Sequence, residues 1–171
     1  MVPLVVLGAA FGLTLLVTAR RSARRRPDVV TALRVGIAVM FVVSGVSHFV
    51  GMREQMIAMV PDALPFPAVI VTLTGLLELA AAVAMLSRRL TPWAAAGLTL
   101  LLIAMFPANV DLALTGTDLT WTQTLVPRTI IQVVYLAATA TLAVLTFRRS
   151  TAGARGQAQR RAALQAPEVR S

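Results

Sequence analysis

One carboxylate lies inside a strongly apolar segment of this chain, an unusual place for an ionisable group. Glu78 is near the middle of the run 68–86. A charge at the centre of a bilayer costs about 3 kcal/mol on insertion scales, so such a side chain should face protein or water. Gly75 and Ala82 lie one turn away on the same helical face and allow another helix to approach closely. The bulky residues of the run are expected to face lipid: Leu73, Leu76, Leu77 and Leu79.

Other polar residues lie within or at the ends of the remaining apolar runs. The candidate site consists of His48, Glu78, Asn109, Arg128 and Gln132, with Ser44, Gly75, Pro107 and Tyr135 as supporting residues. A rise of 1.5 Å per residue places Glu78 about 16 Å below the outer boundary and His48 about 3 Å below it. We therefore predict a ladder of polar groups in one half of the bilayer. The difference of about 13 Å predicts that an intermediate group or a water links His48 to Glu78.

The residue types in this ladder are suited to proton transfer and to binding a small polar group. Glu78 would accept a proton near the midplane, and His48 would exchange protons with the outer aqueous phase. Arg128, Asn109 and Gln132 would donate hydrogen bonds to a carbonyl or anionic group. The chain has one histidine and no cysteine, so neither residue type can build a metal site alone, and no metal site is predicted.

Structural interpretations of the same residues remain open. Glu78 and Arg128 would form an interhelical ion pair that only orders the bundle. His48 would be a satisfied polar group at a helix end. Asn109 would compensate the backbone near Pro107, which cannot donate a hydrogen bond to the carbonyl of Ile103.

The apolar segments predict an all-α, polytopic membrane helix bundle. The chain of 171 residues is 57% hydrophobic with a mean hydropathy of +0.79. Its five apolar runs are 2–19, 29–50, 68–86, 93–114 and 127–147. The first run lacks a preceding basic segment, so we expect an uncleaved helix rather than a signal peptide. Met52, Met56 and Met59 recur at helical spacing and predict a short helix packed at the membrane interface.

Arginine distribution predicts the orientation. All sixteen basic residues are arginine, and only Arg53 and Arg128 fall outside the side that carries the others. By the positive-inside rule, the N-terminus lies outside the cell and the C-terminus in the cytoplasm, across the inner membrane. The net charge of +9 is explained by topology, so no nucleic-acid partner is expected. The predicted segments are a transmembrane helix (1–19), a basic cytoplasmic loop (20–28), a four-helix membrane domain (29–147) and a disordered arginine-rich tail (148–171).

The chain resembles the DoxX-like family of small bacterial membrane proteins over about residues 32–143. The resemblance depends on five ordered segments: Gly-Val-Ser-His-Phe at 45–49, Val-Pro-Asp-Ala-Leu-Pro at 60–65, Gly-Leu-Leu-Glu at 75–78, Phe-Pro-Ala-Asn at 106–109, and 128–132. It implies a four-helix core, to which the first span and the tail are additions. Some members are subunits of a thiosulfate:quinone oxidoreductase, and others accompany membrane redox or thiol-stress systems.

Two functions follow as expectations. In the first, the chain is a membrane subunit or accessory of a redox system, possesses a pocket for quinone in its outer half, and works with a redox protein partner. Any catalytic role would be that of an oxidoreductase-associated subunit, without thiol chemistry of its own because cysteine is absent. In the alternative, the chain is a non-enzymatic scaffold or assembly partner whose buried Glu-Arg pair is structural. Small-solute transport lacks the broken-helix repeat pair that would favour it.

Overall fold

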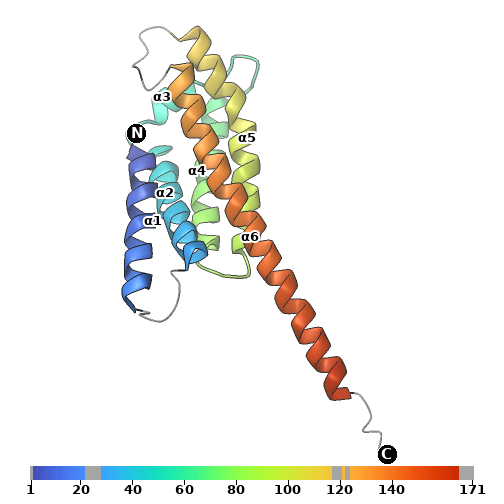
Figure 1. Cartoon of the computed structure of the whole chain (residues 1–171). Coiled ribbons are helices and arrows are strands. Elements are labelled where there is room, and N and C mark those ends of the chain that lie inside the picture. Colours follow the sequence, from blue (N-terminus) through green and yellow to red (C-terminus); the bar gives the residue numbers. More distant parts are fainter. Residues whose placement is uncertain (1, 22–27, 117–120, 122–123, 166–171) are drawn as a thin grey trace, which may run out of the picture.

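The computed structural model describes residues 2–21, 28–116, 121 and 124–165, in which all the longer regular elements are α-helices. In chain order these are α1 (Val2–Arg21), α2 (Val29–Ser47), α3 (Arg53–Ala58), α4 (Pro67–Ala84), α5 (Thr91–Thr115) and α6 (Leu125–Gln165). Five of them run along the bundle, and the short α3 crosses one end of it (Figure 1). We refer to this end as the α3 end and to the opposite one, which holds Arg34, Arg88 and Arg149, as the arginine-rich end.

Among the residues that the structure describes, four helices are long and apolar enough to cross a membrane: α2, α4, α5 and α6. The prediction of an all-α membrane bundle is therefore confirmed. The first apolar run also forms a helix, α1. On α4, Leu73, Leu76 and Leu77 are more than half exposed, as expected for side chains that face lipid. Leu79 is different, because it is half-buried against Gly45 of α2.

Close helix packing places α2 at the centre of the bundle. It contacts α1 on one side and α4 on another, while α5 and α6 pack side by side (Figure 1). Gly36 allows α1 to approach, because an added Cβ would lie 3.2 Å from the Leu7 carbonyl oxygen. Between α5 and α6 the Thr99 hydroxyl donates to Thr139 Oγ1 over 3.0 Å. Small residues and interhelical hydroxyl bonds are typical ways to join helices in lipid, where hydrophobic burial gives little preference for association.

The predicted disordered tail is wrong for residues 148–165. Helix α6 continues through this segment without interruption and extends beyond the rest of the bundle (Figure 1). The membrane helix supplies a ready nucleus, so each further residue needs only propagation. The segment is rich in alanine, arginine and glutamine, which favour helix, and contains no proline. Residues 166–171, and residues 22–27 of the predicted basic loop, lie outside the described residues.

Asp28 begins α2, and its carboxylate caps the helix. It accepts hydrogen bonds from the Thr31 amide (3.3 Å) and the Thr31 hydroxyl (2.6 Å). These bonds, the hydroxyl bond first, and the nearby Arg149 hold the pKa of Asp28 below its ordinary range despite partial burial. A carboxyl group with a lowered folded-state pKa stabilises the fold above its unfolded pKa, and the contribution is lost as pH falls through the folded one.

We therefore expect Asp28→Ala to lower the stability of the bundle by about 1 kcal/mol at pH 7. The difference from the wild type should shrink as the pH falls below about 4, where the wild-type carboxylate also protonates. Thermal unfolding in detergent at pH 7 and at progressively lower pH measures both effects. A constant difference across that range would show that the carboxylate is not the stabilising group. Asp28→Asn retains a capping oxygen and should cost less.

Candidate functional site

A cavity of about 440 Å³ lies between α2, α4, α5 and α6 at the α3 end. Every residue of the predicted site lines it: His48, Glu78, Asn109, Arg128 and Gln132. Of the supporting residues, Ser44 and Tyr135 also line it, whereas Gly75 and Pro107 act through the backbone of α4 and α5. Most of the remaining wall is apolar and includes Phe41, Val71 and Leu102. The fold therefore brings polar groups from four helices to one mostly apolar space.

His48 and Glu78 are direct neighbours, so the prediction of an intervening group is wrong. Nδ1 of His48 lies 3.9 Å from Oε2 of Glu78, and both side chains are almost fully buried. The two side chains lie at the same level because α2 and α4 are shifted relative to each other and do not end at a common boundary. Gly75 of α4 lies level with His48 at the end of α2, since a Cβ added at Gly75 would lie 2.6 Å from the His48 Cβ. Gly75 is eight residues into α4, about 12 Å along its axis, and Glu78 is less than one turn further.

The end of α2 fixes the His48 ring. His48 follows the last helical residue, and its Nδ1 lies 3.1 Å from the Ser44 carbonyl oxygen. A carbonyl oxygen only accepts, so Nδ1 carries the proton in this hydrogen bond. In the neutral ring, Nε2 then has the free lone pair. This arrangement leaves His48 able to take up a proton at Nε2 without breaking its bond to the backbone.

Arg128 pairs with Asn109 and not with Glu78. Its Nη1 donates to Asn109 Oδ1 over 2.6 Å, and Nη2 lies 3.9 Å from the sulfur of Met59. The predicted Glu78–Arg128 ion pair is absent from the described residues, where the ionisable neighbour of Glu78 is His48. The reason is position along the helices: Arg128 is in the first turn of α6, level with Asn109 near the end of α5. Asn109 therefore holds the guanidinium and does not compensate the proline.

A side chain from another helix binds the backbone of α5 close to Pro107. Pro107 lies inside α5 and lacks the amide that would bond to the carbonyl of Ile103. The adjacent carbonyl, of Leu102, accepts a 2.6 Å hydrogen bond from the side-chain amide of Gln132. Gln132 is almost fully buried. Its role is therefore to join α6 to the proline-containing part of α5, so it is less available to a ligand than the other polar residues of the cavity.

The segment between α2 and α4 closes the cavity at the α3 end. The predicted short helix is present as α3, but Met52, Met56 and Met59 line the cavity instead of serving only as interface packing. Methionine is flexible and polarizable, which suits an adaptable ligand surface. Arg53 was not predicted to take part, yet it holds the segment in place. Its guanidinium donates to the His48 carbonyl oxygen (3.3 Å) and to the Thr72 hydroxyl (3.0 Å).

Two buried polar atoms on the cavity wall have no hydrogen-bond partner within the described chain. They are Oε2 of Glu78, which is an acceptor when the carboxylate is ionised, and Nε of Arg128, which is a donor. Leaving a buried polar group without a partner costs about 1–3 kcal/mol. The residues that line the cavity therefore include one unpartnered acceptor and one unpartnered donor, on different helices. A water or a ligand with both kinds of group that reached these atoms would satisfy them.

The described residues contain no group of three or more His, Asp or Glu side chains able to hold a metal ion.

A family described as Domain of unknown function (DUF8561) matches residues 37–146, which is 110 of 171 residues. The chain belongs to this family. No curated protein and no solved structure matches it. The family match covers α2 from Ile37 to the part of α6 at Thr146, and so includes every residue of the cavity site.

Proposed function

We propose that this member of the DUF8561 family is a membrane subunit or accessory protein of a quinone-linked redox system, and that its cavity binds the quinone. The observation that carries the proposal is the pair of unsatisfied buried atoms, Glu78 Oε2 and Arg128 Nε, in two residues that line one largely apolar cavity. A quinone ring is flat and apolar, its carbonyl oxygens accept hydrogen bonds, and the reduced quinol donates them. The cavity supplies the complementary donor and acceptor.

The volume and lining also fit this class of ligand. Small-molecule sites typically measure about 300–1,000 Å³ and combine an apolar wall with a few polar groups. At about 440 Å³ the cavity accommodates a quinone ring, while an isoprenoid tail would have to extend beyond it toward lipid. Arg128, held by Asn109, would bind a carbonyl oxygen, and the methionines of the α3 segment would pack on the ring. The resemblance to the DoxX-like family supports the same class of ligand.

A bound quinone would supply two-electron chemistry, with electrons delivered by a separate redox protein. The chain's own residues would manage protons. Reduction of the quinone takes up two protons, so Glu78 would accept a proton at Oε2 and pass it on. Nδ1 of His48 lies 3.9 Å from Oε2 but is bonded to the backbone, so cavity water would carry protons between Glu78 and Nε2 of His48. In the orientation expected from the arginine distribution, the α3 end faces the outside of the inner membrane. Protons would then enter and leave on that side.

Glu78→Gln tests the proposal because it keeps the size of the side chain but removes the carboxylate. We expect the Kd for a short-chain quinol to rise about tenfold, the value of one hydrogen bond to a charged group. Calorimetric titration of the quinol into the purified full-length protein in detergent measures the Kd. Glu54→Gln is the matched control, since Glu54 lies exposed on α3 and outside the cavity lining. Its Kd should equal that of the wild type.

Absence of quinone and quinol binding to the wild type would overturn the proposal. Equal binding by the wild type and Glu78→Gln would remove Glu78 from the site. Loss of thermal stability in Glu78→Gln without any ligand effect would instead support the alternative, a scaffold in which the buried polar residues only order the bundle.

A further inference from the structure

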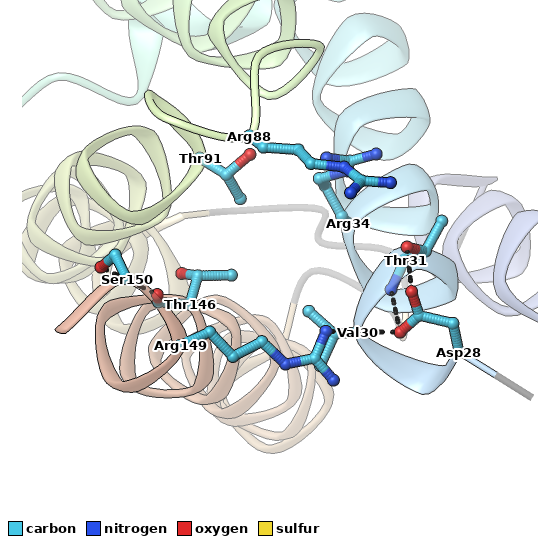
Figure 2. A pocket seen from close by; sticks show the side chains of 9 residues that line it. All are labelled: Asp28, Val30, Thr31, Arg34, Arg88, Thr91, Thr146, Arg149 and Ser150. Atoms are coloured by element: carbon cyan, nitrogen blue, oxygen red, sulfur yellow. Dashed lines mark hydrogen bonds and ion pairs between the residues drawn. The ribbon is translucent and has the colours of Figure 1, made fainter. Parts of the chain in front are cut away.

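A second pocket lies at the opposite, arginine-rich end of the bundle and belongs to a different set of residues. Its volume is about 300 Å³, and three arginines from three parts of the fold line it. Arg34 comes from the second turn of α2, Arg88 from the link between α4 and α5, and Arg149 from α6 (Figure 2). None of these residues contributes to the quinone cavity. The inference below therefore does not depend on the proposed function.

The positive charge of this pocket is incompletely balanced. Asp28 is its one acidic lining residue and lies 3.5 Å from Arg149, between Nη1 and Oδ1. The side chains of Arg34 and Arg88 form no hydrogen bond or ion pair with any other part of the described chain. Three lining arginines and one aspartate leave a net charge of +2 around the space.

The lining hydroxyl groups do not satisfy the arginines. The Thr91 hydroxyl donates to the Ser87 carbonyl oxygen (2.8 Å), and Ser150 and Thr146 donate to carbonyl oxygens within α6. Their hydrogens are therefore used by the backbone, and the pocket presents guanidinium groups as its free donors. Figure 2 shows Arg34 and Arg88 on one side of the pocket and Arg149 with Asp28 on the other. An anion entering between them would meet donors from α2, α6 and the α4–α5 link.

We propose that this pocket binds a phosphate group, carried by an anionic phospholipid or by a soluble phosphate, mainly through Arg34 and Arg88. Guanidinium groups bind phosphate oxygens in pairs of parallel, charge-assisted hydrogen bonds. Basic pockets between helices at a membrane surface are suited to phospholipid head groups. Because Arg34, Arg88 and Arg149 come from separate elements, a phosphate held by them would also tie α2 and α6 to the α4–α5 link.

The test uses the purified full-length chain in a neutral detergent, with phosphatidylglycerol and inorganic phosphate as separate probes. Native mass spectrometry and calorimetry measure the binding of each probe. Arg34→Gln with Arg88→Gln should weaken binding about tenfold or more. The matched control is Arg89→Gln with Arg148→Gln, which removes the same charge from exposed positions at the same end but outside the lining. Binding by this control should stay within about twofold of the wild type.

Binding of phosphatidylglycerol alone would identify a lipid site, and binding of inorganic phosphate alone a soluble ligand. Equal losses in the two double variants would overturn the proposal, because they would indicate general surface attraction. Failure of both probes to bind the wild type would overturn it too. Arg34→Lys with Arg88→Lys retains the charge that topology requires and should still lose affinity several-fold, since lysine lacks the planar fork.

Asp28→Asn provides a test of opposite sign. The carboxylate competes with the ligand for Arg149, whereas asparagine keeps the helix cap without the charge. We expect phosphate binding to strengthen about two- to fivefold, the size of one exposed ion pair. Weaker binding in Asp28→Asn, with the fold intact by thermal unfolding, would contradict the proposed place of the anion.

Discussion

Replacing Arg128 by alanine is expected to weaken quinone binding by about 10- to 100-fold. The estimate follows from the loss of a hydrogen bond to a charged donor, typically worth about 1.5–3 kcal/mol in a buried site. Nε of Arg128 is buried on the cavity wall without a partner, and the bond from Nη1 to Asn109 holds the guanidinium in place. Calorimetric titration of a short-chain quinone into Arg128→Ala and into the wild type measures the difference.

Two further variants make this prediction specific. Arg128→Lys keeps the positive charge but removes the Nε donor, so it should recover only part of the affinity. Arg89→Ala removes an exposed arginine at the other end of the bundle and should leave binding unchanged. If Arg128→Ala binds quinone as tightly as the wild type while remaining folded, the guanidinium does not contact the ligand.

The same variant tests the structural alternative through stability. Glu78 and Arg128 form no ion pair, so Glu78→Gln and Arg128→Ala should change the free energy of unfolding additively, to within about 0.5 kcal/mol. A buried ion pair would instead make each single variant costly, by about 3–5 kcal/mol, and the double variant would recover much of the loss. Thermal or denaturant unfolding of the three variants without ligand separates the two cases.

Gly75→Ala is expected to destabilise the bundle by about 1–3 kcal/mol, the usual cost of overpacking. The added Cβ would lie 2.6 Å from the Cβ of His48 and 2.9 Å from its Cγ, so α2 and α4 must separate or the histidine must move. Either change alters the contact between His48 and Glu78. We therefore expect a lower unfolding temperature together with weaker quinone binding.

Gly97→Ala is a matched control within the same bundle. Gly97 lies on α5, and an added Cβ would meet nothing within 4 Å. Alanine favours helix over glycine by about 1 kcal/mol, so this variant should be as stable as the wild type or slightly more stable. Changes of opposite sign in the free energy of unfolding would show that the effect of Gly75→Ala comes from packing at Gly75 and not from helix propensity. A neutral Gly75→Ala would contradict the close approach of α2 and α4.

The sequence determined the fold class and the members of the cavity site. Long apolar runs interrupted by arginines and prolines predict membrane helices, because a bilayer accepts little else, and four such helices are present. Polar residues within such runs avoid lipid, so their convergence follows from their cost in an apolar medium. The same reason predicts that the polar residues of these runs share one site. One cavity is lined by all five of them: His48, Glu78, Asn109, Arg128 and Gln132.

Only the tertiary structure decided which of these residues meet. Position along one helix fixes depth to a few ångströms, but the relative shift of two helices depends on contacts between them. Gly45 and Gly75 let α2 settle deep against α4, and this shift brings His48 to 3.9 Å from Glu78. The shift of α6 along α5 likewise brings Arg128 to Asn109. It also brings Gln132 to the Leu102 carbonyl. Spacing within each helix holds no information about these shifts, because they are set by side-chain packing across the interfaces.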